Sequence, residues 1–97
     1  VGLCLDTCHA HAGGLELSGL VERLKTITGR IDLVHLNDSR DGFGSGADRH
    51  ANLGQGQCDP EGLLDVLASA GAPAVLETPG GVAGHRDDLD WVRERLG

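Results

Sequence analysis

The residues of this sequence best suited to chemistry are an aspartate and a histidine two positions apart, Asp48 and His50. In an extended segment, side chains at positions i and i+2 point the same way, so both can reach one ion. A carboxylate oxygen and an imidazole nitrogen form a donor set suited to zinc. The same pair also occurs in solvated loops that bind nothing, so further ligands are needed to predict a metal site.

Three apolar runs supply those further ligands. They cover residues 1–6, 31–36 and 73–77, and each is typical of a strand buried on both faces. Polar side chains of the metal-binding types stand at or just beyond the end of each run. With the opening pair, they form a set of three carboxylates and three imidazoles: Asp6, His9, His35, Asp48, His50 and Glu77.

Helices are predicted between these runs. Residues 7–17 are expected to form a loop, after which Ser18 caps a helix of about ten residues that ends at Gly29. Residues 59–61 provide an N-cap aspartate, a proline at the first helical position and an acidic first turn. We expect this second helix to end at Gly71.

The last helix is expected to begin at Asp87 or Asp88, either of which can act as its N-cap. Its inward face would carry Leu89, Val92 and Leu96. Strands alternating with helices predict right-handed crossovers and a parallel sheet. The expected fold class is therefore α/β, with three β/α units of a TIM (β/α)8 barrel, whose active site lies at the carboxyl ends of the strands.

The composition predicts a piece of a longer protein. Among 97 residues only Phe43 and Trp91 are aromatic, whereas 16 are glycine, so material for a core is scarce. The net charge is −7 and the pI about 4.9, which excludes a basic nucleic-acid patch. Because bound divalent cations reverse the charge at a site, this balance does not exclude a phosphate-bearing substrate.

Three cysteines, without a C-x-x-C pair, favour reduced thiols and a cytoplasmic location. The sequence also has no signal-like segment and no apolar run long enough to cross a membrane. Cys4 and Cys8 are expected to be core thiols, and only Cys8 approaches the strand ends. A Cys8/His9 nucleophile is disfavoured because adjacent residues on an extended segment point apart.

The bland alternative to a metal site is a network of carboxylates and protonated histidines at a solvated rim. Taken singly, Asp6 can cap the following turn, His35 can be a hydrogen-bonded histidine near the core, and Glu77 can pair with an arginine. His11 and His85 stand away from strand ends, and we expect them to be surface or capping residues.

Four sequence blocks occur in order along the chain: CLDTCH at 4–9, HLNDS at 35–39, DRHANLGQG at 48–56 and LETP at 76–79. With helix-sized gaps between them, they resemble the C-terminal part of endonuclease IV, the deoxyribonuclease IV family of AP endonucleases. The resemblance covers essentially the whole sequence. It implies the last three β/α units of a TIM barrel enzyme, with residues 1–97 as a fragment of its single domain.

The resemblance also implies zinc-dependent hydrolysis of the DNA phosphodiester on the 5′ side of abasic sites. Of three zinc ions in the family, one would be held by a complete set here: His9, Asp48 and His50. A second would take three ligands from this chain, together with a bridging glutamate from an earlier strand: Asp6, His35 and Glu77. These six residues would act in catalysis through the bound metal.

Arg49, between two of the ligands, is expected either to contact a DNA phosphate or to stabilise its loop. The expected partner is double-stranded DNA with abasic sites, the expected protein a cytoplasmic monomer without membrane contact. The isolated 97 residues are expected not to nick such DNA, because the bridging glutamate is missing and two sheet edges are left uncovered.

Two other functions remain open. A sugar or sugar-phosphate isomerase or epimerase on the same barrel would need only one divalent metal, for which Asp6, His35 and Glu77 suffice. The chain can also be an inactive fragment or a metal-binding domain. Asp48 and His50 are not needed by the isomerase, so their presence favours the nuclease.

Overall fold

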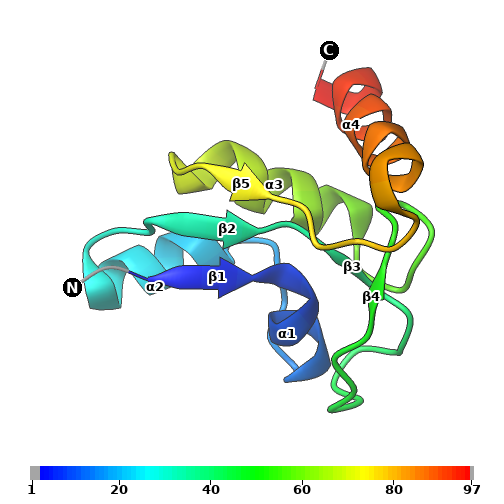
Figure 1. The fold of residues 1–97 in the computed structure, drawn as a ribbon. Coiled ribbons are helices and arrows are strands. Elements are labelled where there is room, and N and C mark those ends of the chain that lie inside the picture. Colours follow the sequence, from blue (N-terminus) through cyan, green and yellow to red (C-terminus); the bar gives the residue numbers. More distant parts are fainter. Residues whose placement is uncertain (1–2, 97) are drawn as a thin grey trace.

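The computed structural model describes residues 3–96 and shows a small parallel sheet with helices beside it (Figure 1). The elements, in chain order, are β1 (Cys4–Asp6), α1 (Thr7–Ala12), α2 (Leu20–Thr28), β2 (Leu33–His35), β3 (Asp38–Ser39), β4 (His50–Ala51), α3 (Pro60–Ala70), β5 (Ala74–Val75) and α4 (Gly81–Leu96). Among residues 3–96, no helix is both long and apolar enough to cross a membrane.

The sheet has the strand order β1-β2-β5, and both pairings are parallel. Asp6 lies opposite His35 in the first pairing, and His35 lies opposite Val75 in the second. All three strands therefore end at one edge of the sheet, and Figure 1 shows α1, β3 and β4 beyond that edge. The predicted parallel α/β arrangement is confirmed.

The core lies between the sheet and the layer formed by α2 and α3. Leu5 and Val34 point toward these helices and are buried, whereas Cys4 on the other face is exposed. Burial on both faces, and a core position for Cys4, were wrong for the part of the chain that the structure describes. The buried apolar cluster contains Leu5, Ala10, Leu17, Leu20, Val21, Ile31, Val34, Leu36, Leu53, Cys58, Leu63, Val66 and Ala70.

Glycines end the two helices of this layer, as predicted. Gly29 after α2 and Gly71 after α3 are left-handed, with φ of 85° and 63°, a conformation that costs a glycine little. At the start of α3, Asp59 accepts a hydrogen bond from the Glu61 N–H at 3.2 Å. The predicted Ser18 cap is wrong, because a left-handed Gly19 precedes α2 and provides no side-chain cap.

Two helices differ from the prediction. Residues 7–17, expected as a loop, contain α1, which Asp6 caps by accepting the His9 N–H at 3.1 Å. Helix α4 begins at Gly81, so Asp88 lies inside the helix and is buried. Leu89 and Leu96, expected to face inward, are about half exposed, while Trp91 and Val92 pack against the core.

Candidate metal centre

The first cluster of ligand-type side chains lies at the carboxyl edge of the sheet. Asp6, His35 and Glu77 each place one ligand atom within 4.8 Å of the others. Asp6 and His35 end β1 and β2, and Glu77 follows β5, so the parallel register brings them together. His35 Nδ1 and Glu77 Oε1 are 2.5 Å apart, within hydrogen-bond distance.

Hydrogen bonds between side chains and backbone groups hold this cluster in place. Because Asp6 Oδ1 caps α1, its second oxygen remains available at the strand end. The fully buried Asn37 accepts the Glu77 N–H at its Oδ1, 2.9 Å away. The Thr7 hydroxyl donates to the Asn37 carbonyl oxygen at 2.6 Å and accepts the Asn37 N–H at 2.8 Å. The ends of the three strands are thus tied together.

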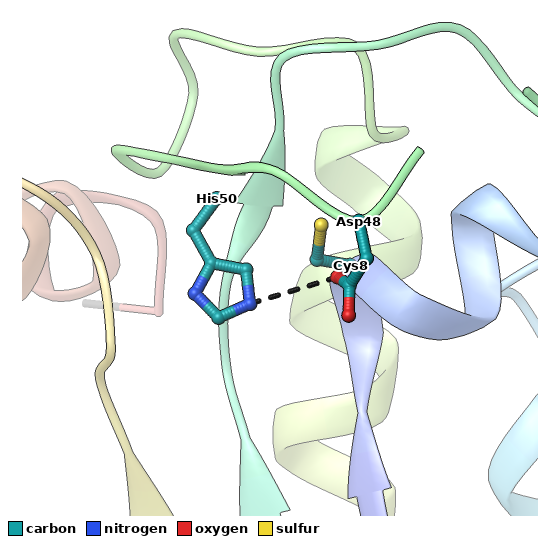
Figure 2. Close-up of side chains that lie close together, drawn as sticks. All are labelled: Cys8, Asp48 and His50. Atoms are coloured by element: carbon teal, nitrogen blue, oxygen red, sulfur yellow. Dashed lines mark ion pairs between the residues drawn. The ribbon is translucent and has the colours of Figure 1, made fainter. Parts of the chain in front are cut away.

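The second cluster contains Cys8, Asp48 and His50, whose ligand atoms also lie within 4.8 Å of one another (Figure 2). His50 Nε2 is 3.7 Å from Asp48 Oδ1, and Cys8 Sγ is 3.6 Å from the Arg49 carbonyl oxygen. Burial and a hydrogen bond with Asp48 raise the pKa of the Cys8 thiol to about 12. Cys8, expected as a core thiol, is buried but also stands at ligand distance.

His9 approaches the second cluster from outside. Its Nδ1 lies 3.4 Å from Asp48 Oδ2, and its side chain is 78% exposed. Asp48 therefore faces both predicted partners, His9 through one carboxylate oxygen and His50 through the other. Of the three residues predicted for this site, Asp48 therefore lies near His9 and near His50. The structure adds Cys8, which the sequence had not favoured as a ligand.

His50 joins the two clusters into one centre. Its Nε2 lies 3.6 Å from Asp6 Oδ2, and its Nδ1 lies 3.1 Å from the Glu77 carbonyl oxygen. A carbonyl oxygen only accepts hydrogen bonds, so in the neutral ring Nδ1 carries the proton. The lone pair of Nε2 then faces the carboxylates of Asp6 and Asp48, where a cation can use it.

The residues of this centre fit a zinc ion. Carboxylate and imidazole are zinc ligands, as is the thiolate form of cysteine, and the three-residue clusters leave room for a further ligand. Within residues 3–96, the ion pairs of Asp6, Asp48 and Glu77 are with histidines alone. Three carboxylates beside neutral imidazoles leave uncompensated negative charge, which either protonated histidines or bound cations would balance.

Arg49 is occupied by an ion pair within its own loop. Its Nε and one terminal nitrogen donate to the two oxygens of Asp41 at 2.9 and 2.6 Å. These hydrogen bonds hold the pKa of the Asp41 carboxyl below its usual range. The Arg49 side chain is nonetheless 64% exposed, so its remaining N–H groups face solvent.

The two remaining histidines differ in their positions. His11, expected to be a surface or capping residue, is buried. Its Nε2 contacts the Asp41 carbonyl oxygen at 2.9 Å, and its own carbonyl accepts the Gly44 N–H at 2.9 Å. It thereby attaches α1 to the loop between β3 and β4. His85 is half-buried, with Nε2 3.0 Å from the Thr78 carbonyl oxygen. Both lie outside the two clusters of ligand atoms.

Two aspartates of this region are buried, which the sequence analysis did not predict. Asp38 is completely buried and Asp88 is 1% exposed, and both accept hydrogen bonds from the segment that follows His50. The paired glycines Gly54 and Gly56 are a sequence signal for the first, because they indicate a close backbone approach. The local signal of Asp88 was misleading, since this residue resembles the N-cap of the last helix.

Comparison with known proteins gives consistent matches. Residues 1–95 match the family described as xylose isomerase-like TIM barrel. Proteins named "Probable endonuclease 4" from Mycobacterium bovis (strain BCG / Pasteur 1173P2) and Mycobacterium tuberculosis (strain ATCC 25177 / H37Ra) are each 57% identical over 97 residues. These matches cover 100% of this chain and 38% of each relative, so the chain spans less than half the length of its curated relatives.

A solved structure matches as well. The crystal structure of endonuclease IV from Thermus thermophilus is similar with a TM-score of 0.84 and 38% sequence identity. The match covers 99% of this chain and 39% of that chain. The arrangement of sheet and helices is therefore that of one part of a TIM barrel.

Proposed function

This chain belongs to the xylose isomerase-like TIM barrel family, and we propose that it is part of a zinc-dependent endonuclease. The reaction is hydrolysis of the DNA phosphodiester on the 5′ side of abasic sites, as in base excision repair. Similarity to proteins named endonuclease 4 and endonuclease IV supports the proposal. The observation that carries it is the second ligand cluster, Asp48 with His50, beside the first.

We propose that residues 1–97 form the last three β/α units of a longer single-domain enzyme, which we call the parent enzyme. The share of each relative that the chain covers, 38% and 39%, is consistent with three of eight units. The sheet edges at β1 and β5 would then pair with strands from the rest of the barrel. The bridging glutamate and the remaining zinc ligands would come from that part.

Two sets of residues would hold zinc in the parent enzyme. One set is Asp6, His35 and Glu77, and the other is His9, Asp48 and His50, with Cys8 adjacent. Bound zinc would supply Lewis acidity, which stabilises the negative charge that develops on phosphate oxygens during hydrolysis.

The protein positions these ligands before any substrate arrives. The Glu77 carbonyl holds the proton of His50 on Nδ1, so that Nε2 is directed at Asp6 and Asp48. The α1 cap orients Asp6, and the Asn37 side chain fixes the backbone of Glu77. Such preorganisation avoids reorganising the ligands at each turnover.

Among the charged residues near the metal centre, we propose that Arg49 contacts the DNA. The ion pair with Asp41 supports its other proposed role, in loop stability, and the two roles are compatible because a guanidinium has five N–H donors. We propose that the parent enzyme binds double-stranded DNA with abasic sites and acts as a cytoplasmic monomer. Arg49→Ala should weaken binding to abasic duplex and reduce its salt dependence, whereas an unchanged salt slope would leave only the loop role.

The competing function is that of a sugar or sugar-phosphate isomerase. The first cluster by itself would hold the single divalent metal of an isomerase. The choice between isomerase and nuclease therefore depends on Asp48 and His50. In the parent enzyme, His50→Ala should remove about one equivalent of zinc and most of the cleavage of abasic duplex DNA, with His85→Ala as the control outside the clusters. Zinc content and cleavage that both stay unchanged in His50→Ala would refute the proposed function.

A further inference from the structure

The carboxylate of Asp38 is buried, and backbone N–H groups surround it. It is fully inaccessible to solvent. Its Oδ1 accepts the N–H groups of Ser39 and Cys58 at 2.7 and 2.9 Å, and its Oδ2 accepts those of Gly54 and Gly56 at 3.0 and 3.1 Å. Four N–H dipoles therefore replace the water that burial removes, and neither oxygen can be dispensed with.

The surroundings of Asp38 leave no room for a looser arrangement. A Cβ added at Gly56 would lie 2.2 Å from the Ser39 carbonyl oxygen and 2.5 Å from Asp38 Oδ1. The Ser39 carbonyl also accepts the Gln57 N–H at 2.7 Å. Segment 54–58 is thus held against β3 through side chain and backbone together, and its path depends on both oxygens of one carboxylate.

This anchor acts on the strand that carries a ligand. Asp38 pairs with Ala51 in the β3–β4 ladder, and Ser39 pairs with His50. His50 is therefore part of the ladder, the anchored segment 54–58 follows β4 in the chain, and Asp48 precedes His50 by two residues. Movement of that segment would displace the backbone that aims His50 Nε2 at Asp6 and Asp48.

We propose that Asp38 is a positioning residue for the metal-ligand pair Asp48 and His50. The inference rests on the proposed metal-dependent function, and it concerns a residue that touches neither ligand side chain. Asp38 acts through the backbone amides of residues 54–58, which keep the ligand pair in one geometry. A cation at the second cluster then meets preformed ligands rather than a mobile loop.

The test is Asp38→Asn in the parent enzyme, with zinc affinity measured by competition against a chelating dye. Asparagine has the same shape, but its NH2 group must face two N–H donors that the carboxylate oxygen accepted. Zinc at one site should bind at least about tenfold more weakly, with the other equivalents unchanged. The control is Asp65→Asn, since Asp65 likewise accepts a backbone N–H, from Gly19 at 2.9 Å, but in the helical layer.

The outcomes separate this inference from the proposed function. If His50→Ala removes one zinc equivalent and Asp38→Asn leaves every affinity unchanged, the inference fails while the proposed function stands. If His50→Ala changes neither the zinc content nor the cleavage, the function itself fails. A weaker site in Asp38→Asn alone, and not in Asp65→Asn, supports the positioning role.

A second measurement covers the case in which Asp38→Asn does not fold. In the wild-type parent enzyme, amide hydrogen exchange at Gly54, Gly56 and Cys58 is followed with and without zinc. If these amides hold the ligand pair, then zinc binding must stabilise them in return, and we expect at least about tenfold slower exchange with zinc bound. Equal rates in the two states, with zinc bound at the site that depends on His50, would overturn the proposal.

Discussion

Asp88 joins three separate parts of the chain, and its replacement by leucine should destabilise the parent enzyme. This residue of α4 accepts the Leu53 N–H at 2.8 Å and the Thr78 hydroxyl, which is buried with it. It also accepts the Asn52 side-chain amide at 3.3 Å. The turn after β5 and the segment after β4 are thereby fastened to one helix.

The size of the effect follows from the donors that leucine would leave behind. The Leu53 N–H and the Thr78 hydroxyl would lose their acceptor, and each unsatisfied buried donor costs about 1–3 kcal/mol. The Asn52 amide keeps another acceptor, the Pro79 carbonyl oxygen at 3.0 Å. We therefore expect Asp88→Leu to lower the free energy of unfolding by about 3 kcal/mol, after allowance for the buried leucine. Asp88→Asn keeps one acceptor oxygen and should cost about 1 kcal/mol.

Urea unfolding of the parent enzyme, followed by circular dichroism, measures this difference. Asp87→Leu is the matched control, since Asp87 is the exposed neighbour on the same helix. The change at position 87 should stay within about 0.5 kcal/mol of wild type. If Asp88→Leu destabilised no more than Asp87→Leu, the hydrogen bonds of Asp88 would not carry the energy assigned to them.

Two further predictions concern the same region. Gly56→Ala should destabilise the parent enzyme by at least about 2 kcal/mol in urea unfolding, because the added Cβ meets backbone and carboxylate oxygens, whereas Gly42→Ala, with nothing within 4 Å, should change little. Burial and the nearby Asp38 raise the pKa of the Cys58 thiol. At pH 8, iodoacetamide should therefore label Cys58 at least about tenfold more slowly than free cysteine, and the labelling rate should increase with pH. Labelling as fast as free cysteine would show that this thiol is neither buried nor protonated.

The strands, the glycines that end α2 and α3, and the convergence of Asp6, His35 and Glu77 at one edge of the sheet could be predicted from the sequence. Apolar runs ending in Asp6, His35 and Glu77 identify parallel strands, and parallel strands place their ends at one edge. Gly29 and Gly71 follow from the conformational freedom of glycine. These features depend on local chemistry or on the order of strands and helices along the chain, and both can be predicted from the sequence.

Other features depend on contacts between distant segments. Helix α1 has only six residues and an exposed His9, so its apolar period is too short to recognise. The start of α4 was misplaced because Asp88 resembles an N-cap, whereas its carboxylate serves a segment 35 residues earlier. His11 was assigned to the surface since nothing local shows that the β3–β4 loop would cover it.

The acidic residues around the strand ends fall into two groups according to what neutralises them. Asp38 and Asp88 are buried, and backbone N–H groups, a hydroxyl and an amide surround them, so their charge is already satisfied. Asp6, Asp48 and Glu77 are partly exposed and, within residues 3–96, form ion pairs with histidines alone.

The first group needs no cation, whereas protonated histidines or bound cations would balance the carboxylates of the second group. The same residue type thus builds the frame in one group and offers ligands in the other. Within residues 3–96, no lysine or arginine forms an ion pair with these carboxylates, so under the proposed function bound metals would offset part of the net charge of −7.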